Sequence, residues 1–398
     1  MNKPRLAVGI DAGSSKTRCV VCLLENSRLQ FLGYGEAPAR GWAKSRITDQ
    51  NGVAESIRNA VAEAERLAQV SVESAVVGIG GAAIEGANGR GVYEFGRPRE
   101  VEAGDLGYAV ERATRVRLEE DRLLLQVFPQ DFTVDGRAGY RNPQGVKCSR
   151  LEANVHIITA NLQEHQFLVA AVHQAHLAVE ETVFEAMAAA YAAVLPEDRN
   201  RGVAVVDIGM HSTGITIYDC EALLLAASIP VGGDHFTKDV AWCLTTSYED
   251  AEMLKLEYGC AILGLTSDHS LIEIPSPDGR PSREATRRQL NVVLEARAEE
   301  LFEYVRAAVT RVGMEQSLLE GIVLCGGGAR LAGMCDMAER VLNCQARNGL
   351  AIGIRDWPEE LNQTEWTVAA GLSMYSARLK LKREQRRRAP GLAGMVLR

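Results

Sequence analysis

Two short segments of this chain carry the residue types that bind a polyphosphate. Each has an apolar run, then Asp-x-Gly with small hydroxyl residues, then a second apolar run: VGIDAGSSKTRCVV around Asp11 and VAVVDIGMHSTGITIY around Asp207. This pattern is typical of a tight β-hairpin whose turn presents backbone N–H groups to phosphate, with an Asp nearby to hold a hydrated metal. Two such hairpins in one chain predict a clamp on a nucleotide.

The residues around each turn suit that chemistry. Gly13 and Gly209 lack the Cβ that would block close approach of the backbone to a ligand. Asp11 and Asp207 only accept hydrogen bonds, so beside phosphate they require a cation such as Mg²⁺ between them and the ligand. Hydroxyl or cationic donors are available on both turns: Ser14, Ser15, Lys16, Ser212 and Thr213.

A single Asp-x-Gly is weak evidence, because the same three residues form many ordinary turns. Asp105-Leu106-Gly107 is a third match, and it lies at the start of a helical pattern without flanking strands. The prediction of a phosphate site therefore rests on the predicted strands that flank the other two matches.

Length and composition indicate a soluble protein with more than one domain. The 398 residues exceed what one core organises, and 46% hydrophobic with 24% charged residues is ordinary for a globular chain. No segment approaches the roughly eighteen consecutive apolar residues of a spanning helix. A core strand is predicted almost at Met1, which leaves no room for a signal peptide, so we expect a cytoplasmic protein.

The cysteines indicate a reducing environment. All nine are scattered without the spacing of a metal site, and an odd number cannot pair completely within the chain. Cys19 and Cys22 lie three residues apart on a predicted strand and so point to opposite faces. We expect buried, reduced thiols.

The net charge of −8 is unevenly distributed. Residues 378–398 hold eight basic residues and one acid, a local charge of +7, so the rest of the chain carries −15. An acidic body argues against nucleic-acid binding, and the basic tail predicts an anionic partner.

The order of predicted elements repeats. The first copy consists of strands 6–11, 17–24 and 28–35, a helix over about 51–69 and a strand over 74–80; the second begins with strands 203–207, 215–219 and 223–230, followed by a helical pattern after Gly232 and Gly233. We therefore predict an α/β fold of two duplicated halves facing a ligand cleft.

Two insertions interrupt the repeat. Residues 82–160 are predicted as a small α+β unit with a helix near 103–116 and strands near 122–128 and 151–159. Residues 234–315 are predicted to be mainly helical, with a long amphipathic helix over 283–312. The predicted units are 1–81, 161–195 and about 366–385 for the first half, 82–160 for the small unit, 196–233 and 316–365 for the second half, 234–315 for the helical unit, and 378–398 for the basic tail.

Beyond the hairpins, the sequence resembles the actin-like ATPases, the superfamily of actin, Hsp70 chaperones and sugar kinases, whose halves are ribonuclease H-like. Within that superfamily it resembles the FtsA family of bacterial cell-division proteins over residues 5–375. The most specific matches are PARG (38–41), VFPQDFTVDG and RNPQGV (within 127–146), VHIITA (155–160), PVGGDHFTKDVA (230–241), AEMLKLEYGCA (251–261), IPSPDGRPSR (274–283) and GIVLCGGGARLAGM (321–334). The unit at 82–160 matches the subdomain that distinguishes this family from actin.

The resemblance implies binding of ATP with Mg²⁺ and assigns further residues. The two hairpins match its two phosphate motifs, and Asp11 and Asp207 would hold Mg²⁺ through water. The other matches are Gly232 and Gly233 at a turn near the nucleotide, Glu252 and Lys255 at the ribose, and Gly326, Gly327, Gly328 and Arg330 at the adenosine. Glu252 and Lys255 lie three residues apart on one helix face and could equally be a plain surface ion pair.

Departures from the family pattern limit the expected turnover. Met210 and His211 stand where the second motif usually has glycines, and Gly214 stands where it usually has Asp. Glu185 is the only local candidate to position water, and its sequence context favours an exposed helix carboxylate instead. His211 in a turn is more often simply solvated. We expect tight ATP binding with slow or undetectable hydrolysis.

The resemblance also implies a role at the division site. The family links the tubulin-like FtsZ to the inner membrane by binding its C-terminal tail, assembles into actin-like filaments and recruits later division proteins. FtsZ docking uses the helical unit 234–315, where the candidates are Arg283, Arg297 and Glu300. Basic residues suit an acidic peptide, although a solvated helix face explains any one of them as well.

The C-terminus departs from the family, which usually ends in a linker and an amphipathic helix with aromatic residues. Here Pro390 ends any helix continuing from 366–388. The candidate membrane contacts are Arg386, Arg387, Arg388, Leu392, Met395, Val396 and Leu397. We expect weak, salt-sensitive binding to anionic lipid on the cytoplasmic side of the inner membrane, at about 1 kcal/mol per charge.

Two alternatives share the hairpins. A sugar or acetate kinase would need a substrate pocket with a catalytic base, and no such motif accompanies the matches. PilM, an actin-like scaffold of the pilus machine, has a similar small subdomain and is the nearer rival.

Overall fold

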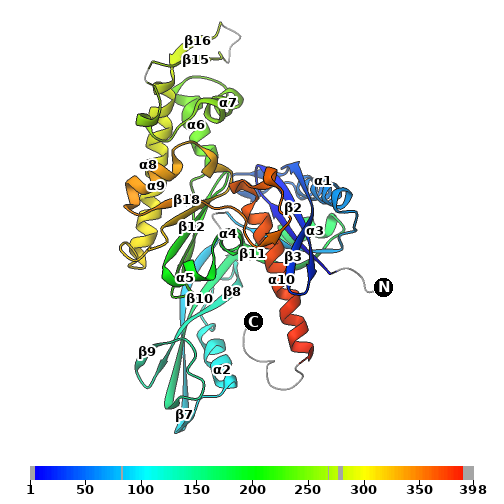
Figure 1. The fold of residues 1–398 in the computed structure, drawn as a ribbon, viewed down its shortest axis with the longest axis vertical. Coiled ribbons are helices and arrows are strands. Elements are labelled where there is room, and N and C mark those ends of the chain that lie inside the picture. Colours follow the sequence, from blue (N-terminus) through cyan, green and yellow to red (C-terminus); the bar gives the residue numbers. More distant parts are fainter. Residues whose placement is uncertain (1–4, 82–83, 268, 277–280, 389–398) are drawn as a thin grey trace.

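The computed structural model describes residues 5–81, 84–267, 269–276 and 281–388. Two sheets built in the same way form its centre (Figure 1). The first has the strand order β11-β6-β1-β2-β3-β19 and the second β14-β13-β12-β17-β18. The bounds are β1 (Leu6–Ala12), β2 (Lys16–Glu25), β3 (Arg28–Pro38), β6 (Ser74–Ile79), β11 (Ala178–Phe184) and β19 (Ile354–Arg355), then β12 (Val203–Ile208), β13 (Thr213–Asp219), β14 (Ala222–Ile229), β17 (Ile322–Cys325) and β18 (Ala346–Asn348).

Strand pairing confirms the predicted duplication. β1 pairs antiparallel with β2 and parallel with β6, and β12 pairs antiparallel with β13 and parallel with β17. Each sheet thus places an Asp-x-Gly hairpin at the same point of the same topology. One strand crosses over: β19 lies within 316–365, the range predicted for the second half, yet it pairs with β3 of the first sheet.

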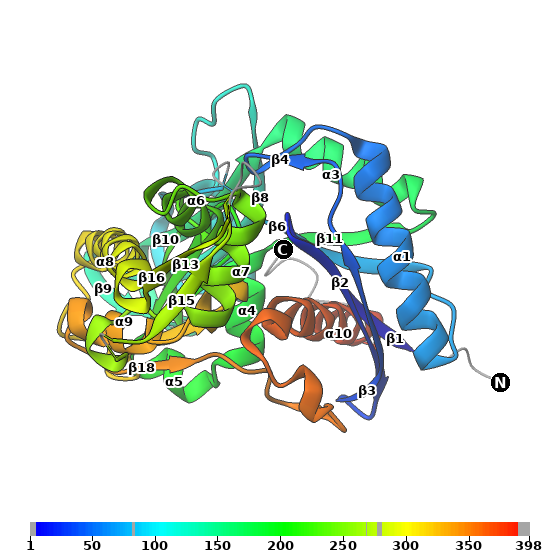
Figure 2. The same cartoon turned by 90° about the horizontal axis from the view of Figure 1, so that it is seen from above.

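Helices cover both faces of the first sheet. In Figure 2, α1 (Gln50–Ala68) lies on one side and α10 (Thr367–Arg388) on the other. α1 begins where Asp49 accepts a hydrogen bond from the Asn51 amide at 3.0 Å, and it buries an apolar face that includes Val53 and Ile57. The remaining helices of the two halves are α3 (Leu162–Gln174), α4 (Glu185–Ala193), α5 (Pro196–Arg201) and α9 (Met334–Leu342).

The centre is packed at backbone contact. A Cβ on Gly371 of α10 would lie 1.8 Å from the carbonyl oxygen of Ala188 in α4, and a Cβ on Gly9 of β1 would lie 2.4 Å from the amide nitrogen of Ser373. Both glycines are required because the two helices and β1 touch where a side chain would stand. This contact fixes the position of α10 relative to β1 and α4.

The small unit is a separate sheet with its own core. It has the strand order β7-β10-β8-β9, covered by α2, and extends from one end of the molecule (Figure 1). His156 accepts a hydrogen bond from the Ala226 amide at 2.9 Å, which ties β10 to β14 of the second half. The bounds are β7 (Glu85–Glu100), α2 (Ala103–Ala113), β8 (Arg122–Val134), β9 (Arg137–Tyr140) and β10 (Lys147–Asn161).

The helical unit occupies the other end in Figure 1. Its helices are α6 (Gly233–Cys243), α7 (Tyr248–Tyr258) and α8 (Arg287–Arg311), and β15 (Leu271–Ile274) pairs with β16 (Arg283–Thr286). Thr286 caps α8 by accepting from the Gln289 amide, so the predicted helix start at Arg283 is wrong and that residue lies in a strand. The shorter elements are β4 (Trp42–Ala43), β5 (Arg46–Ile47) and the 3-10 turns η1 (Leu263–Leu265), η2 (Gly327–Arg330), η3 (Glu359–Leu361) and η4 (Thr364–Trp366).

All nine cysteines lie in the described part of the chain and are unpaired, as expected. Cys19 and Cys22 are buried, whereas Cys220 and Cys243 are exposed. The expectation of burial is therefore wrong for the last two.

The contact at Gly371 gives a first prediction. Gly371→Ala should lower the free energy of unfolding by about 1–3 kcal/mol, because the new methyl group meets a backbone carbonyl that cannot move aside. Gly104→Ala is the matched control: it is also a helical glycine, with no atom within 4 Å of its Cβ, and should be neutral or stabilising by less than about 1 kcal/mol. Urea unfolding of both variants measures this, and equal losses would contradict it.

Candidate functional site

The first turn joins β1 and β2 as predicted. Asp11 is the residue opposite Arg18 in the register, and the turn spans Gly13 to Ser15. Ser15 and Lys16 are exposed. The Lys16 ammonium forms an ion pair with Glu36 of β3, so its charge is partly compensated.

The second turn is held by hydrogen bonds within the turn and from the start of α6. Within it the Gly209 amide donates to the Ser212 carbonyl at 2.9 Å, and the Gly233 amide at the start of α6 donates to the Gly209 carbonyl at 2.9 Å. A Cβ on Gly232 would lie 2.6 Å from the Gly209 carbonyl oxygen. The Thr213 hydroxyl is buried and donates to the Val231 carbonyl at 2.8 Å. Gly232, Gly233 and Thr213 thus hold the turn in place.

The residues that depart from the family pattern also lie here. The Met210 carbonyl accepts from the Asp234 amide at 2.7 Å. His211 is half-buried, its Nδ1 has no hydrogen-bond partner among the described residues, and burial lowers its pKa, so the ring is neutral. A Cβ on Gly214 would lie 2.8 Å from the Cβ of Ala186 in α4, which leaves no space there for an Asp side chain.

The glycines after β17 pack against the second hairpin. Gly326 has φ +81°, and a Cβ there would lie 2.6 Å from Asp207 Oδ1; one on Gly328 would lie 2.3 Å from Ile208 Cγ2. Gly327 has no atom within 4 Å of its Cβ position. Gly326 and Gly328 are therefore needed for internal packing, and Gly327 is the one with open space before it.

Three carboxyl groups meet at the base of the two turns. Asp11 and Asp207 are 8% and 7% exposed. Burial raises the pKa of Asp11 to about 6, although Arg18 opposes the shift. Burial and the Asp11 charge raise the pKa of Asp207 to about 7. The pKa of Glu185 lies well above its ordinary value, because the group is desolvated and faces both aspartates.

The interpretation of Glu185 as an exposed helix carboxylate is wrong. It is half-buried at the first position of α4, and a Cβ on Gly80 would come within 1.9 Å of its Oε2. The short helix of small residues, with seven of nine buried, packs between the halves and turns its N-terminal carboxylate into the cleft. The sequence signal is the apolar stretch AMAAAYAA, which has no solvent face.

A charge network that sequence reasoning missed spans the cleft. Arg18, only 9% exposed, lies 2.8 Å from Glu36 and 3.3 Å from Glu365. Glu365 also pairs with Arg330 at 2.6 Å. The adenosine candidate Arg330 is thereby connected to the strand that follows the first turn. A lone Arg in the apolar run TRCVV is the signal that a buried partner exists.

Glu252 and Lys255 form the ion pair that one interpretation allowed, at 2.7 Å, but it is not a plain surface pair. Lys255 is 9% exposed and its ammonium donates to Thr237 Oγ1 at 2.8 Å and to the Gly233 carbonyl at 3.2 Å. The pair therefore joins α7 to the turn behind the second hairpin.

The predicted partner-binding residues lie outside this site. Arg297 Nε is 2.5 Å from Asp239 Oδ2, and its guanidinium also pairs with Glu300, so it joins α8 to α6. Arg283 donates to the Leu244 carbonyl at 2.5 Å. Arg386, Arg387 and Arg388 end α10, and Leu392, Met395, Val396 and Leu397 lie outside the described residues.

The two facing halves define an actin-like fold, as predicted. The chain is similar to the PilM-PilN type IV pilus biogenesis complex, with a TM-score of 0.67 and 17% identity over 93% of this chain and 98% of that one. It is also similar to MreB5 of Spiroplasma citri bound to ADP, with a TM-score of 0.57 and 13% identity over 96% and 98% of the two chains.

Sequence comparison identifies the family within this fold. The profile of "Cell division protein FtsA" matches residues 204–371, and that of "SHS2 domain inserted in FTSA" matches residues 81–159. The chain is 33% identical to the cell division protein FtsA of Pseudomonas aeruginosa, over 93% of this chain and 89% of that protein. It is 30% identical to that of Escherichia coli K12, over 96% and 92%. The chain belongs to the FtsA family of cell-division proteins.

Over the described residues, no helix combines the length and the apolar character needed to cross a membrane.

The carboxylates give a pH prediction. Folding raises the pKa of Asp207 from 3.8 to about 7, so between those values the unfolded chain has released a proton that the folded chain still holds. This group therefore costs stability as pH rises from about 4 to 7. In chelator, Asp207→Asn should raise the melting temperature at pH 8 and give a smaller gain at pH 5. Differential scanning fluorimetry measures both, and an equal gain at the two pH values would contradict the assignment.

Proposed function

We propose that this protein binds ATP with Mg²⁺ in the cleft between its two halves. The observation that carries the proposal is the convergence of Asp11, Asp207 and Glu185 at the base of two matched turns. Buried, mutually repelling carboxylates are stabilised by a cation, and oxygen ligands suit Mg²⁺. The similarity to MreB5, whose structures hold ADP and AMPPNP, supports the same cleft.

The position of each residue determines which part of the nucleotide it would bind. Asp11 and Asp207 would hold the cation through water, as the family resemblance implies. The turn amides and the side chains of Ser14, Ser15, Lys16 and Ser212 would bind phosphate. Gly327, which has open space before it, and Arg330 would contact the adenosine. Glu252 and Lys255 position the turn that approaches the ribose.

Slow hydrolysis follows from the second turn. Two of its carbonyls are held by the α6 amides, a neutral imidazole stands in the turn, and Gly214 supplies no carboxylate. Glu185 is the remaining group that could orient water; burial and the charges of Asp11 and Asp207 raise its pKa, and a bound cation would lower it.

We also propose that the protein links FtsZ to the cytoplasmic face of the inner membrane and assembles into actin-like filaments that recruit later division proteins. Membership of the FtsA family supports this role. The FtsZ tail would dock on the helical unit at α6, α8 and β16, where Arg283, Arg297 and Glu300 lie. The basic end of α10 and the residues after it would contact anionic lipid.

A PilM-like scaffold and a kinase remain the rival functions. The similarity to PilM, at 17% identity, concerns the fold alone, whereas identities of 30–34% over nearly the whole chain are to FtsA proteins. Co-purification with FtsZ in place of pilus components distinguishes these roles.

The nucleotide proposal predicts tight binding with little turnover. Asp11→Asn and Asp207→Asn should each weaken Mg-dependent ATP binding about tenfold or more, about 1.4 kcal/mol, and Asp336→Asn, an exposed aspartate on α9, should not. Calorimetry with and without Mg²⁺ measures this. Turnover should stay below about 0.1 per second, against an enzyme median of about 10 per second; vigorous ATPase activity in the isolated protein would refute slow hydrolysis.

The division proposal is tested by recruiting FtsZ to vesicles of anionic lipid. The full chain should carry FtsZ into the vesicle pellet. Arg297→Glu should lose FtsZ yet still sediment, because like charge repels an acidic tail; Arg297→Gln, which also breaks the contacts with Asp239 and Glu300, controls for the fold. A chain ending at Arg388 with Arg386, Arg387 and Arg388 changed to Glu keeps the packed part of α10 and should stay in the supernatant. Sedimentation equal to the full chain would refute this anchor.

A further inference from the structure

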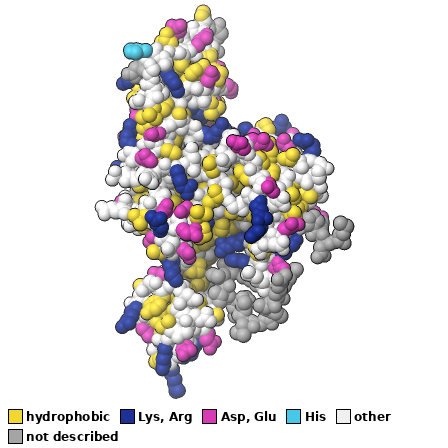
Figure 3. All heavy atoms as spheres, viewed as in Figure 1, with side chains coloured by type: hydrophobic (Ala, Val, Ile, Leu, Met, Phe, Trp, Pro, Cys, Tyr) yellow, Lys and Arg dark blue, Asp and Glu magenta, His cyan; other side chains and the backbone are white. Residues whose placement is uncertain are grey.

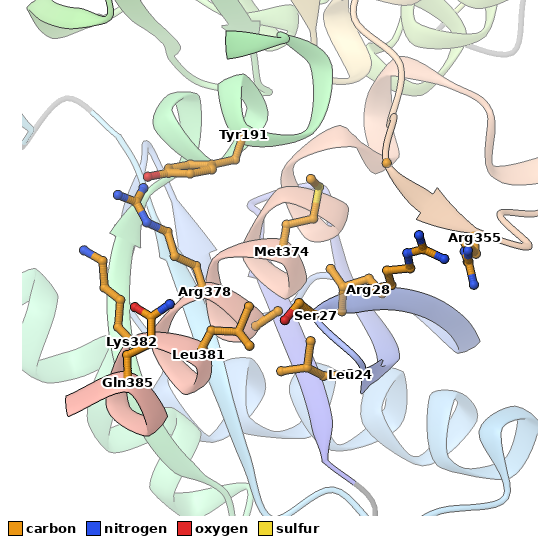
Figure 4. A pocket seen from close by; sticks show the side chains of 13 residues that line it. Leu24, Ser27, Arg28, Tyr191, Arg355, Met374, Arg378, Leu381, Lys382 and Gln385 are labelled. Carbon is orange, nitrogen blue, oxygen red and sulfur yellow. The ribbon is translucent and has the colours of Figure 1, made fainter. Parts of the chain in front are cut away.

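A cavity of about 650 Å³ lies far from the nucleotide cleft. It forms where the β2–β3 turn, the end of α4, β19 and the second half of α10 meet (Figure 4). β2 runs from Lys16 beside the phosphate turn to Glu25 beside the cavity, a span of about 30 Å at 3.3 Å per residue. The cavity is therefore a separate site, independent of the function proposed above.

The floor of the cavity is apolar. Leu24 and Leu29 are 4% and 9% exposed, and Met374 and Leu381 are half-buried beside them. Met374, Ala377 and Leu381 recur at intervals of three and four residues, so they form one stripe of α10 beside the cavity. Ala377 is buried in this stripe, whereas Met374 and Leu381 keep part of their surface exposed. Figure 4 shows Met374, Leu381 and Leu24 pointing into the same space.

The two ends of the cavity are positively charged. Arg28 and Arg355 lie at one end, and Arg378 and Lys382 at the other (Figure 4). Arg28 and Arg355 are exposed and form no ion pair within the described residues, and Arg378 stacks over the Tyr191 ring at 5.3 Å. In Figure 3, hydrophobic side chains reach the surface of this face of the molecule with both basic and acidic side chains among them. Four basic side chains therefore surround this apolar floor, although the whole chain has a net charge of −8.

We propose that this cavity binds a short apolar segment of a partner protein, flanked at each end by Asp or Glu. Apolar side chains would cover the exposed part of the α10 stripe, and the flanking carboxylates would pair with Arg28 and Arg355 at one end and with Arg378 at the other. Charge selects this occupant over two others. An anionic lipid places its charge at one end only, and the C-terminal residues of this chain include Arg386, Arg387, Arg388 and Arg398, whose positive charge does not complement a basic rim.

The test uses a fluorescein-labelled helical peptide of about twelve residues, three turns long, with leucines along one face and two glutamates at each end. Anisotropy titration with the full chain should show saturable binding that weakens as salt rises. Arg28→Glu with Arg355→Glu should reduce the affinity about tenfold or more, and Leu381→Gln should reduce it as well. The matched control is Arg97→Glu with Arg137→Glu, two exposed arginines of the small sheet, which should bind as the unmodified chain does. Unchanged melting temperatures show that the variants are folded.

Four results would overturn the proposal. Equal binding of the same peptide with glutamine in place of glutamate would exclude charge recognition. A chain ending at Arg388 that binds the peptide about tenfold more tightly would identify the protein's own C-terminal residues as the occupant. Displacement of the peptide from that shortened chain by phosphatidylglycerol vesicles would identify lipid. Absence of saturable binding to the full chain also refutes it.

Discussion

The backbone contact among β1, α4 and α10 is the constraint on which the rest of this structure depends. Gly9 and Gly371 have no space for a side chain, so α10 lies directly on the first sheet and on the helix that leads into the second half. Since Asp11 is the second-last residue of β1 and Glu185 is the first of α4, their positions follow from this contact. A methyl group at either glycine would move the helix, and with it the carboxylates at the base of the cleft.

That packing buries three carboxyl groups near one another, and the fold compensates only part of their charge. Asp11, Asp207 and Glu185 are desolvated together, and Arg18 is the cation that lowers the pKa of the first. Arg18 is shared with Glu36 and Glu365, and burial still raises the pKa of both aspartates despite its charge. A bound cation would offset part of the cost of burying these carboxylates together. Glu365 also pairs with Arg330, which connects the charges of the first hairpin to the turn after β17.

The sequence predicts the repeated topology well, because apolar alternation and Asp-x-Gly turns are local signals. What it does not predict depends on contacts between distant segments. The apolar stretch after Glu185 indicates a buried helix, but it does not indicate that the helix packs between the halves and brings Glu185 near two aspartates. The lone Arg18 in an apolar run indicates a buried partner, and Glu36 lies opposite it on the next strand. Its second partner, Glu365, cannot be inferred because it comes from the other end of the chain. The motif suggests that Gly326 lets the backbone pass close to a flat base. In the structure a side chain at this position would already collide with Asp207.

The second turn keeps its backbone shape although several of its side chains differ from the family pattern. Its backbone is held from behind by the α6 amides, so the turn keeps its shape without the glycines that usually form it. Gly214, packed against Ala186, leaves no room for a second-motif carboxylate, and the neutral His211 brings neither charge nor a strong base. These departures lie in the side chains, whereas the backbone of the turn is fixed by hydrogen bonds and close packing. The proposal of ATP binding with slow hydrolysis rests on this contrast, because binding would depend on the shape and charge of the turns and hydrolysis on one group beside the attacking water. Glu185, whose pKa is raised by burial and by the two aspartates, is the candidate for that group.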